Sequence, residues 1–170
     1  MRILFRHRNL WGELQQREMD IVYQSEKGMI THSVVENARQ PLYIDGACVL
    51  ENGYTVVSFI EYGRWYITDK VFDFQASPTG FLAKVVTPVE ENLTFLTTMD
   101  LFVRFWITPH GEFHTFGTKM FRKVSEEGLL SETVEKNAKE VIDDLIFRIQ
   151  GKEFPPDHVR TFMIEKKDNF

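Results

Sequence analysis

The sequence has one cysteine, no long apolar run and no surplus of positive charge, and each absence excludes a class of protein. Cys48 is the single cysteine, so an intramolecular disulfide and a thiolate metal cage are both excluded. No stretch approaches the ~18 consecutive apolar residues of a membrane-spanning helix. The opening residues 1–8 are too short and too basic for a signal peptide. We therefore expect a soluble, cytoplasmic protein with no membrane partner.

The formal net charge of −5 argues against broad nonspecific binding to nucleic acid, which depends on basic surfaces. We expect no DNA partner, although a local basic pocket is compatible with an acidic protein. The sequence also lacks a glycine-rich phosphate loop, a His-x-x-x-His helix motif and a Gly-x-Ser-x-Gly nucleophile motif. His110 and His114 straddle a predicted turn, so a surface role is favoured over zinc binding.

The composition predicts one globular domain over residues 1–170. Apolar residues make up 43% and charged residues 26%, which are ordinary fractions, whereas aromatic residues reach 14% and suit a wide, sheet-based core. The aromatic residues of 62–74 are interpreted as core because a base-stacking platform would need an exposed ring beside basic residues.

Short apolar segments separated by turn residues indicate strands throughout the first two thirds of the chain. Met1–Phe5 is predicted as an edge strand, and Asp45-Gly46 and Thr108-Pro109-His110-Gly111 are predicted hairpin turns. Regular turns of this kind are typical of an antiparallel barrel or sandwich. We assign residues 1–118 to this barrel-like part.

The periodicity then changes to that of helices. Residues 119–127 predict a short helix ending at Gly128, and Ser131 offers an N-cap for a longer helix ending at Gly151. The face formed by Val134, Val141 and Leu145 should pack on the barrel. The predicted fold is therefore α+β and mainly β, with a helical part over residues 119–156 and a polar tail over residues 157–170.

The region from Gly80 to Phe121 carries the candidate site. Isolated charges interrupt its apolar alternation at Lys84, Asp100, Arg104 and Lys119. Such charges must either face water or line a cavity.

The order of motifs in this region resembles the domain-of-unknown-function 402 family, whose members include FomD-like nucleotide phosphohydrolases. The resemblance covers roughly residues 41 to 156 and is one of spacing and apolar framework. It rests on four short motifs, namely Thr87-Pro88, Thr98-Met99-Asp100-Leu101, Trp106-Ile107 and Pro109-His110-Gly111. It implies a barrel fold and a phosphorylated ligand.

The resemblance also implies roles for particular residues. Asp100 matches the first aspartate of the family's metal-binding motif, and Asp73 coincides with an aspartate before it, so these two are the candidate catalytic residues. Arg17 lies near the position of a phosphate-binding arginine. Two of these residues have a second interpretation. Arg17 lies on an alternating strand and could simply face solvent, and Asp73 could cap its loop through local backbone hydrogen bonds.

The departures from the family pattern share one direction. Lys84, Arg104 and Lys119 stand where the family has acidic or metal-facing groups, and a fixed cation can replace a divalent metal. We therefore expect no cofactor, and these three with Arg17 are predicted to bind an anionic small molecule, possibly a nucleotide, in a catalytically degenerate site. The alternatives are a phosphohydrolase using Mg²⁺ or Mn²⁺, and an RNA-associated or protein-interaction module.

Overall fold

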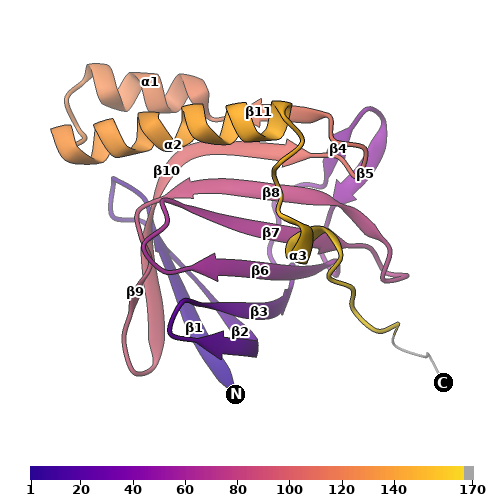
Figure 1. The fold of residues 1–170 in the computed structure, drawn as a ribbon. Helices are drawn as coiled ribbons and strands as arrows, with labels where there is room; N and C mark the ends of the chain where they lie inside the picture. Colours follow the sequence, from indigo (N-terminus) through magenta and orange to yellow (C-terminus); the bar gives the residue numbers. More distant parts are fainter. Residues whose placement is uncertain (167–170) are drawn as a thin grey trace.

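The computed structural model describes residues 1–166; the last four residues of the predicted tail, 167–170, lie outside the described part. Eleven strands precede three helices in the described residues (Figure 1). The strands are β1 Arg2–Arg8, β2 Leu14–Ser25, β3 Gly28–Val34, β4 Leu42–Ile44, β5 Ala47–Leu50, β6 Thr55–Glu61, β7 Tyr66–Phe72, β8 Pro78–Val86, β9 Glu90–Glu91, β10 Phe95–Ile107 and β11 Phe113–Phe116. The helices are α1 Thr118–Glu126, α2 Glu132–Gln150 and α3 Asp157–Arg160.

Seven strands close into a barrel in the order β1-β2-β3-β6-β7-β8-β10, and β10 returns to β1. All neighbouring pairs are antiparallel except β1 and β10, which run parallel with Leu4 opposite Phe95 and Arg8 opposite Met99. The mainly β barrel is as predicted, but the prediction that Met1–Phe5 forms a sheet edge is wrong. Strand β1 is paired on both sides because β10 closes the barrel, and a pairing between residues so far apart leaves no local pattern in the sequence.

The apolar residues form three clusters that divide the barrel into an inside and an outside. One large cluster joins the outward side chains of β6, β7, β8 and β10 to the helices, and includes Tyr66, Phe72 and Phe105. Two smaller clusters, around Phe5 and Met29 and around Val56 and Trp106, contain no helical residues. Because side chains alternate along a strand, these two clusters fill the interior. Tyr66 and Phe72 are therefore buried as predicted, but beneath the helices rather than within the barrel. The prediction is wrong for Phe74, which is 68% exposed because it lies in the turn after β7.

Helix α2 has the predicted ends and the predicted packing face. The Ser131 side chain accepts a hydrogen bond from the Val134 N–H, and the helix ends at Gly151. Ala138, Leu145 and Ile149 are buried, and Val134 and Val141 pack against the same cluster. Helices α1 and α2 lie together along one side of the barrel (Figure 1). The helix thus covers the apolar outer face of β8 and β10.

Residues 157–166, predicted as part of a polar tail, pack against the barrel instead. Val159 is buried and Phe162 meets the ring of Phe59 edge to face. The buried ammonium of Lys70 donates hydrogen bonds of 2.6 Å to the carbonyl oxygens of both Arg160 and Phe162. Helix α3 consequently lies over β6 and β7 (Figure 1).

None of the helices in residues 1–166 is long and apolar enough to cross a membrane. The cytoplasmic location remains a prediction.

Candidate functional site

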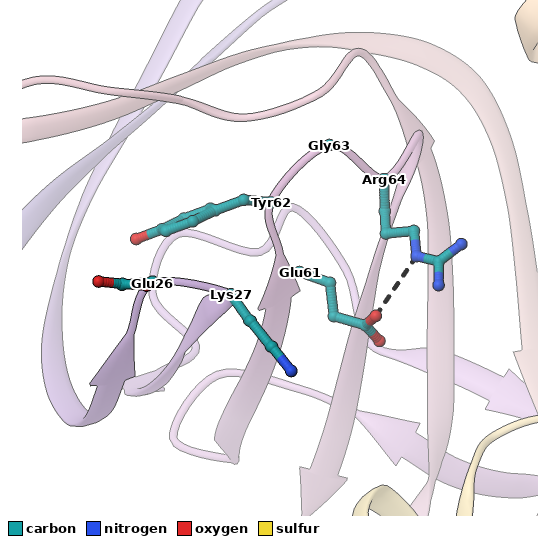
Figure 2. A pocket seen from close by; sticks show the side chains of 6 residues that line it. All are labelled: Glu26, Lys27, Glu61, Tyr62, Gly63 and Arg64. Atoms are coloured by element: carbon teal, nitrogen blue, oxygen red, sulfur yellow. Dashed lines mark hydrogen bonds and ion pairs between the residues drawn. The ribbon is translucent and has the colours of Figure 1, made fainter.

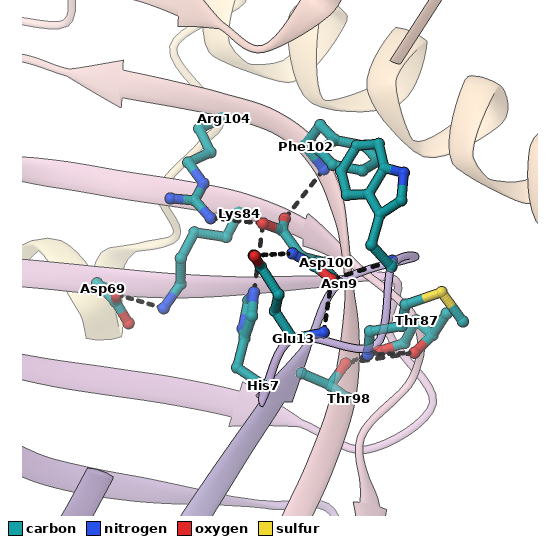
Figure 3. A network of polar contacts seen from close by, with 12 residues as sticks. His7, Asn9, Glu13, Asp69, Lys84, Thr87, Thr98, Asp100, Phe102 and Arg104 are labelled. Atoms are coloured by element: carbon teal, nitrogen blue, oxygen red, sulfur yellow. Dashed lines mark hydrogen bonds and ion pairs between the residues drawn. The ribbon is translucent and has the colours of Figure 1, made fainter. Parts of the chain in front are cut away.

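A layer of polar side chains separates the two apolar clusters inside the barrel. It is built by inward positions on six of the seven barrel strands, and Figure 3 shows part of it around Lys84, Asp100 and Arg104. The main members are His7, Arg17, Ser58, Asp69, Lys84, Asp100 and Arg104. Polar groups in a barrel interior require partners. The side chains of the layer form two networks of hydrogen bonds and ion pairs.

The first network is centred on an ion pair between Lys84 and Asp69. Lys84 Nζ lies 2.6 Å from Asp69 Oδ2, and the Ser58 hydroxyl donates to Asp69 Oδ1 at 2.6 Å. Burial lowers the pKa of Lys84 to about 8, although Asp69 acts in the opposite direction. Burial also opposes ionisation of Asp69, but the cations Lys84 and Arg17 outweigh it and hold the pKa of Asp69 below its usual value.

Arg17 reaches this network from β2. Its Nη2 lies 3.4 Å from the Ser58 hydroxyl, and its guanidinium sits 5.5 Å from the centre of the Phe5 ring. Its Nε is buried and has no hydrogen-bond partner among the described residues. The side chain therefore points into the barrel and keeps unused donor capacity.

The second network links Arg104, Asp100 and His7. Arg104 Nη2 donates to Asp100 Oδ2 at 2.8 Å, and His7 Nε2 lies 3.3 Å from the same oxygen. Burial would raise the pKa of Asp100, but the contact with His7 and the charge of Arg104 outweigh it, and the pKa falls to about 2. Asp100 is thus held as a carboxylate.

An irregularity in β10 makes this pair possible. Asp100 lies opposite Val86, and Arg104 lies opposite Lys84. Between these two pairs β10 advances by four residues and β8 by two, so β10 contains two extra residues. Phe102, in the middle of the bulge, has a left-handed φ of 72°, and its N–H donates to Asp100 Oδ1 at 2.9 Å. A bulge re-aims side chains, and here it brings Arg104 within reach of Asp100.

The cross-strand pair of Lys84 and Arg104 explains why both carboxylates are needed. Like charges directly opposite each other are destabilising, and this pair points into the barrel. Each cation has its own aspartate, yet Arg17 adds a third positive charge. Counting lysine, arginine and aspartate side chains, the layer holds three cations and two carboxylates.

Access to the layer is graded from outside to inside. The side chain of Arg104 is 35% exposed, those of His7 and Asp100 are 15% and 14% exposed, and those of Lys84 and Asp69 are 8% and 5% exposed. Arg104 therefore marks the entrance, and the Lys84–Asp69 pair lies at the bottom.

The structure brings together Arg17, Lys84, Arg104 and Asp100 from the predicted site, but not Lys119 or Asp73. Lys119 is exposed in the first turn of α1, outside the barrel. Asp73 follows the end of β7 that pairs with Pro78, whereas Asp100 lies at the opposite end of β8. Its Oδ1 accepts hydrogen bonds from the N–H groups of Gln75 and Ser77, which is the loop-capping alternative.

Sequence reasoning missed Asp69, Ser58 and His7. A signal for Asp69 was present, because Asp69 and Lys70 are adjacent charges in a strand that is apolar on both sides. Neighbouring residues in a strand face opposite ways, so one of the two charges had to point inward. His7 carried no such signal, since the basic residues 6–8 read as a solvated flank.

The donor set does not fit a divalent cation. Mg²⁺ and Mn²⁺ require several oxygen ligands, and Asp69 and Asp100 are already paired with Lys84 and Arg104. Within residues 1–166, no three His, Cys, Asp or Glu side chains are grouped so that they could hold a metal.

A separate concavity of about 510 Å³ lies between two turns at the end of the barrel (Figure 2). Glu26, Lys27, Glu61, Tyr62, Gly63 and Arg64 line it. Its charges are mixed, and Arg64 Nε lies 3.4 Å from Glu61 Oε2. It includes none of the predicted site residues.

The low pKa of Asp100 predicts an acid-sensitive contribution to stability. A carboxyl whose pKa is lower in the folded chain stabilises the fold at pH values above its ordinary pKa of 3.8. This stabilisation is lost as the pH falls through the folded-state pKa of about 2. The loss should amount to about 2 kcal/mol in the free energy of unfolding. Urea unfolding from pH 5 to pH 2 should therefore show the gap between wild type and Asp100→Asn closing by that amount. An unchanged gap would contradict the prediction, and Asp20→Asn on the outer surface is the control.

Comparisons with known proteins show similarity in fold. No family model matches the chain, and no match was found among curated proteins. Among solved structures, the phosphatase SC4828, in complex with the non-hydrolyzable nucleotide GPCP, superposes with a TM-score of 0.77 at 15% identity, covering 97% of this chain and 89% of the other. FomD in complex with CDP superposes with a TM-score of 0.75 at 12% identity, covering 100% and 94%. At such identities the likeness shows the fold alone.

Proposed function

We propose that this chain binds the phosphate groups of a nucleotide, or of another phosphorylated small molecule, in the polar layer of its barrel. The main support is that three cations, Arg17, Lys84 and Arg104, converge there with only two carboxylates, those of Asp69 and Asp100. Two proteins of the same fold were solved with nucleotides, which supports the choice of ligand. The FomD-like resemblance in the sequence points the same way.

The ligand would enter beside Arg104 and compete with Asp100 for its guanidinium. Arginine offers two parallel donors to phosphate oxygens, and Arg17 keeps a buried Nε without a partner among residues 1–166. Lys84 contributes a compact charge at the bottom of the layer. Because cations take the place of a metal, the proposed site binds anions without one and lacks the activated water that a metal supplies. The protein proposed here therefore binds its ligand but has lost the catalytic activity of the FomD-like phosphohydrolases that it resembles.

The test is binding of pyrophosphate in EDTA, measured by calorimetry and by the melting temperature. At 100 times the Kd, a ligand stabilises the folded state by about 2.7 kcal/mol, which is roughly 5–10 °C for a chain of this size. Arg104→Ala should weaken binding at least ~10-fold, the size of one charge-assisted bidentate contact. Arg104→Lys should recover part of the loss.

Arg64→Ala is the matched control, because Arg64 also pairs with a carboxylate but lies at a distant turn. No binding by the wild type, or full binding by Arg104→Ala, would refute the proposal.

A second candidate function is metal-dependent hydrolysis of nucleoside phosphates, which the phosphatase among the structural neighbours favours. It requires Asp100 to leave Arg104 and bind a metal. Phosphate release from nucleoside di- and triphosphates with Mg²⁺, Mn²⁺ or Co²⁺, absent in Asp100→Asn, would replace the binding proposal with this one.

A further inference from the structure

The loop between β1 and β2, residues 9–13, is held in one conformation beside the polar layer. The Asn9 side-chain amide donates to Glu13 Oε2 at 2.7 Å, and its oxygen accepts from the N–H groups of Trp11 and Glu13, both at 3.0 Å. The loop starts two residues after His7, which contacts Asp100, and Trp11 contacts the Phe102 ring; Figure 3 shows Asn9 and Glu13 of this loop. A short loop closed by three such hydrogen bonds presents its tip residue, Trp11, in a fixed position.

Trp11 is largely exposed although it carries a large aromatic ring. Its exposed fraction is 56%, and its ring makes an edge contact with Phe102 at a centroid distance of 5.5 Å and an interplanar angle of 62°. An edge contact of this kind fixes a ring without covering both of its faces. Much of the indole therefore faces solvent.

Phe102 connects this aromatic pair to the charged entrance. It occupies the β10 bulge in a left-handed conformation that is rare for a bulky residue, and its N–H holds Asp100, the partner of Arg104. Trp11, Phe102, Asp100 and Arg104 thus form one continuous row, from an exposed ring to a guanidinium. An exposed ring beside basic residues is what a base-stacking position requires.

We infer that Trp11 stacks against the base of a nucleotide whose phosphates lie on Arg104, Lys84 and Arg17. This inference rests on the proposed function and adds a base subsite to it. Because every base has a π-face and no side-chain amide or carboxylate need read its edge, stacking selects nucleotides over inorganic phosphates without selecting one base. The rigid loop means that this gain costs little ordering of the protein.

The test compares CDP and GDP with inorganic pyrophosphate in EDTA, by calorimetry on the full chain. Wild type should bind both nucleotides about 10-fold more tightly than pyrophosphate, the size of one stacked base. Trp11→Ala should remove this preference and leave the affinity for pyrophosphate within about twofold. Trp11→Phe, which keeps a π-face, should restore most of the preference. Phe147→Ala removes another exposed aromatic ring, 73% exposed on α2, and should change nothing.

The outcomes separate the subsite from the function on which it rests. If Trp11→Ala keeps the full preference for nucleotides while Arg104→Ala weakens all three ligands, the base subsite is wrong and the phosphate site stands. If wild type binds none of the three, both are wrong. A preference lost in Trp11→Ala and regained in Trp11→Phe supports the inference, because a merely structural role of Trp11 would alter pyrophosphate binding as well.

Discussion

Asp69→Ala should destabilise the fold by about 3–5 kcal/mol, since removing one partner of a buried ion pair leaves the other charge uncompensated. The Lys84 ammonium, whose side chain is 8% exposed, would lose its only carboxylate partner at 2.6 Å within the described residues. The Ser58 hydroxyl would lose its acceptor as well. For a chain of 170 residues this corresponds to a fall of roughly 6–20 °C in the melting temperature. Thermal and urea unfolding at pH 7 measure it.

Two comparisons identify the buried charge as the cause. Replacing both partners, in Asp69→Leu with Lys84→Met, should recover most of the lost stability, because the Lys84 ammonium is then no longer buried without its carboxylate. Asp20→Ala, which breaks an exposed pair with Arg2, should cost no more than about 1 kcal/mol.

The effect of Asp69→Ala should also shrink as the pH rises. The pKa of Lys84 is about 8 with Asp69 present, and removing Asp69 lowers it further, so a pH of 9 leaves Lys84 neutral in the variant. A lysine whose pKa is lower in the folded chain destabilises the fold at pH values below its unfolded pKa, and this cost decreases as the pH rises. A deficit that stays constant from pH 7 to pH 9 would rule out this explanation.

Lys70→Met should release residues 157–166 from the barrel. The substitution keeps an apolar side chain of similar length. It removes the ammonium, with its two 2.6 Å hydrogen bonds to Arg160 and Phe162 and its contacts with the Phe72 and Phe81 rings. Hydrogen bonds from a charged donor contribute about 1.5–3 kcal/mol each, and loss of the buried ammonium's desolvation cost offsets part of this. We expect a net loss of about 2–3 kcal/mol and rapid proteolytic cleavage within residues 157–166.

Mass spectrometry of a limited protease digest would locate the cleavage. Lys136→Met, at an exposed position of α2, is the control and should digest like wild type. Equal protection of residues 157–166 in Lys70→Met would show that apolar packing by Val159 and Phe162 is sufficient to hold the segment.

Much of the fold follows from local sequence signals, and the site follows only in part. Turn and capping residues such as Thr108–Gly111 and Ser131 act on their immediate neighbours, so the elements they delimit could be predicted. The parallel pairing of β1 with β10 depends on residues about ninety positions apart and has no local signal. The same distance hid His7, which reaches Asp100 only because that pairing places the two strands side by side.

Local structure also explains why Lys84 and Arg104, but not Lys119, lie inside the barrel. Lys84 and Arg104 interrupt apolar alternation within strands, where position decides which face a side chain occupies. Lys119 does not follow this alternation in the structure, because β11 ends at Phe116 and Gly117, at a φ of 80°, begins α1. Alternation carries no information once the backbone changes to a helix.

The seam between β1 and β10 also bears on how the protein is made. As the chain leaves the ribosome, β1 and β2 can form a hairpin at once, but Leu4 must wait for Phe95 before the circle of strands closes. Such long-range pairings are slow to form. His7 comes from one side of the seam and Asp100 from the other, so the contact between them cannot form before the two strands pair. A ligand that needs residues from both strands can therefore bind only after the seam has formed.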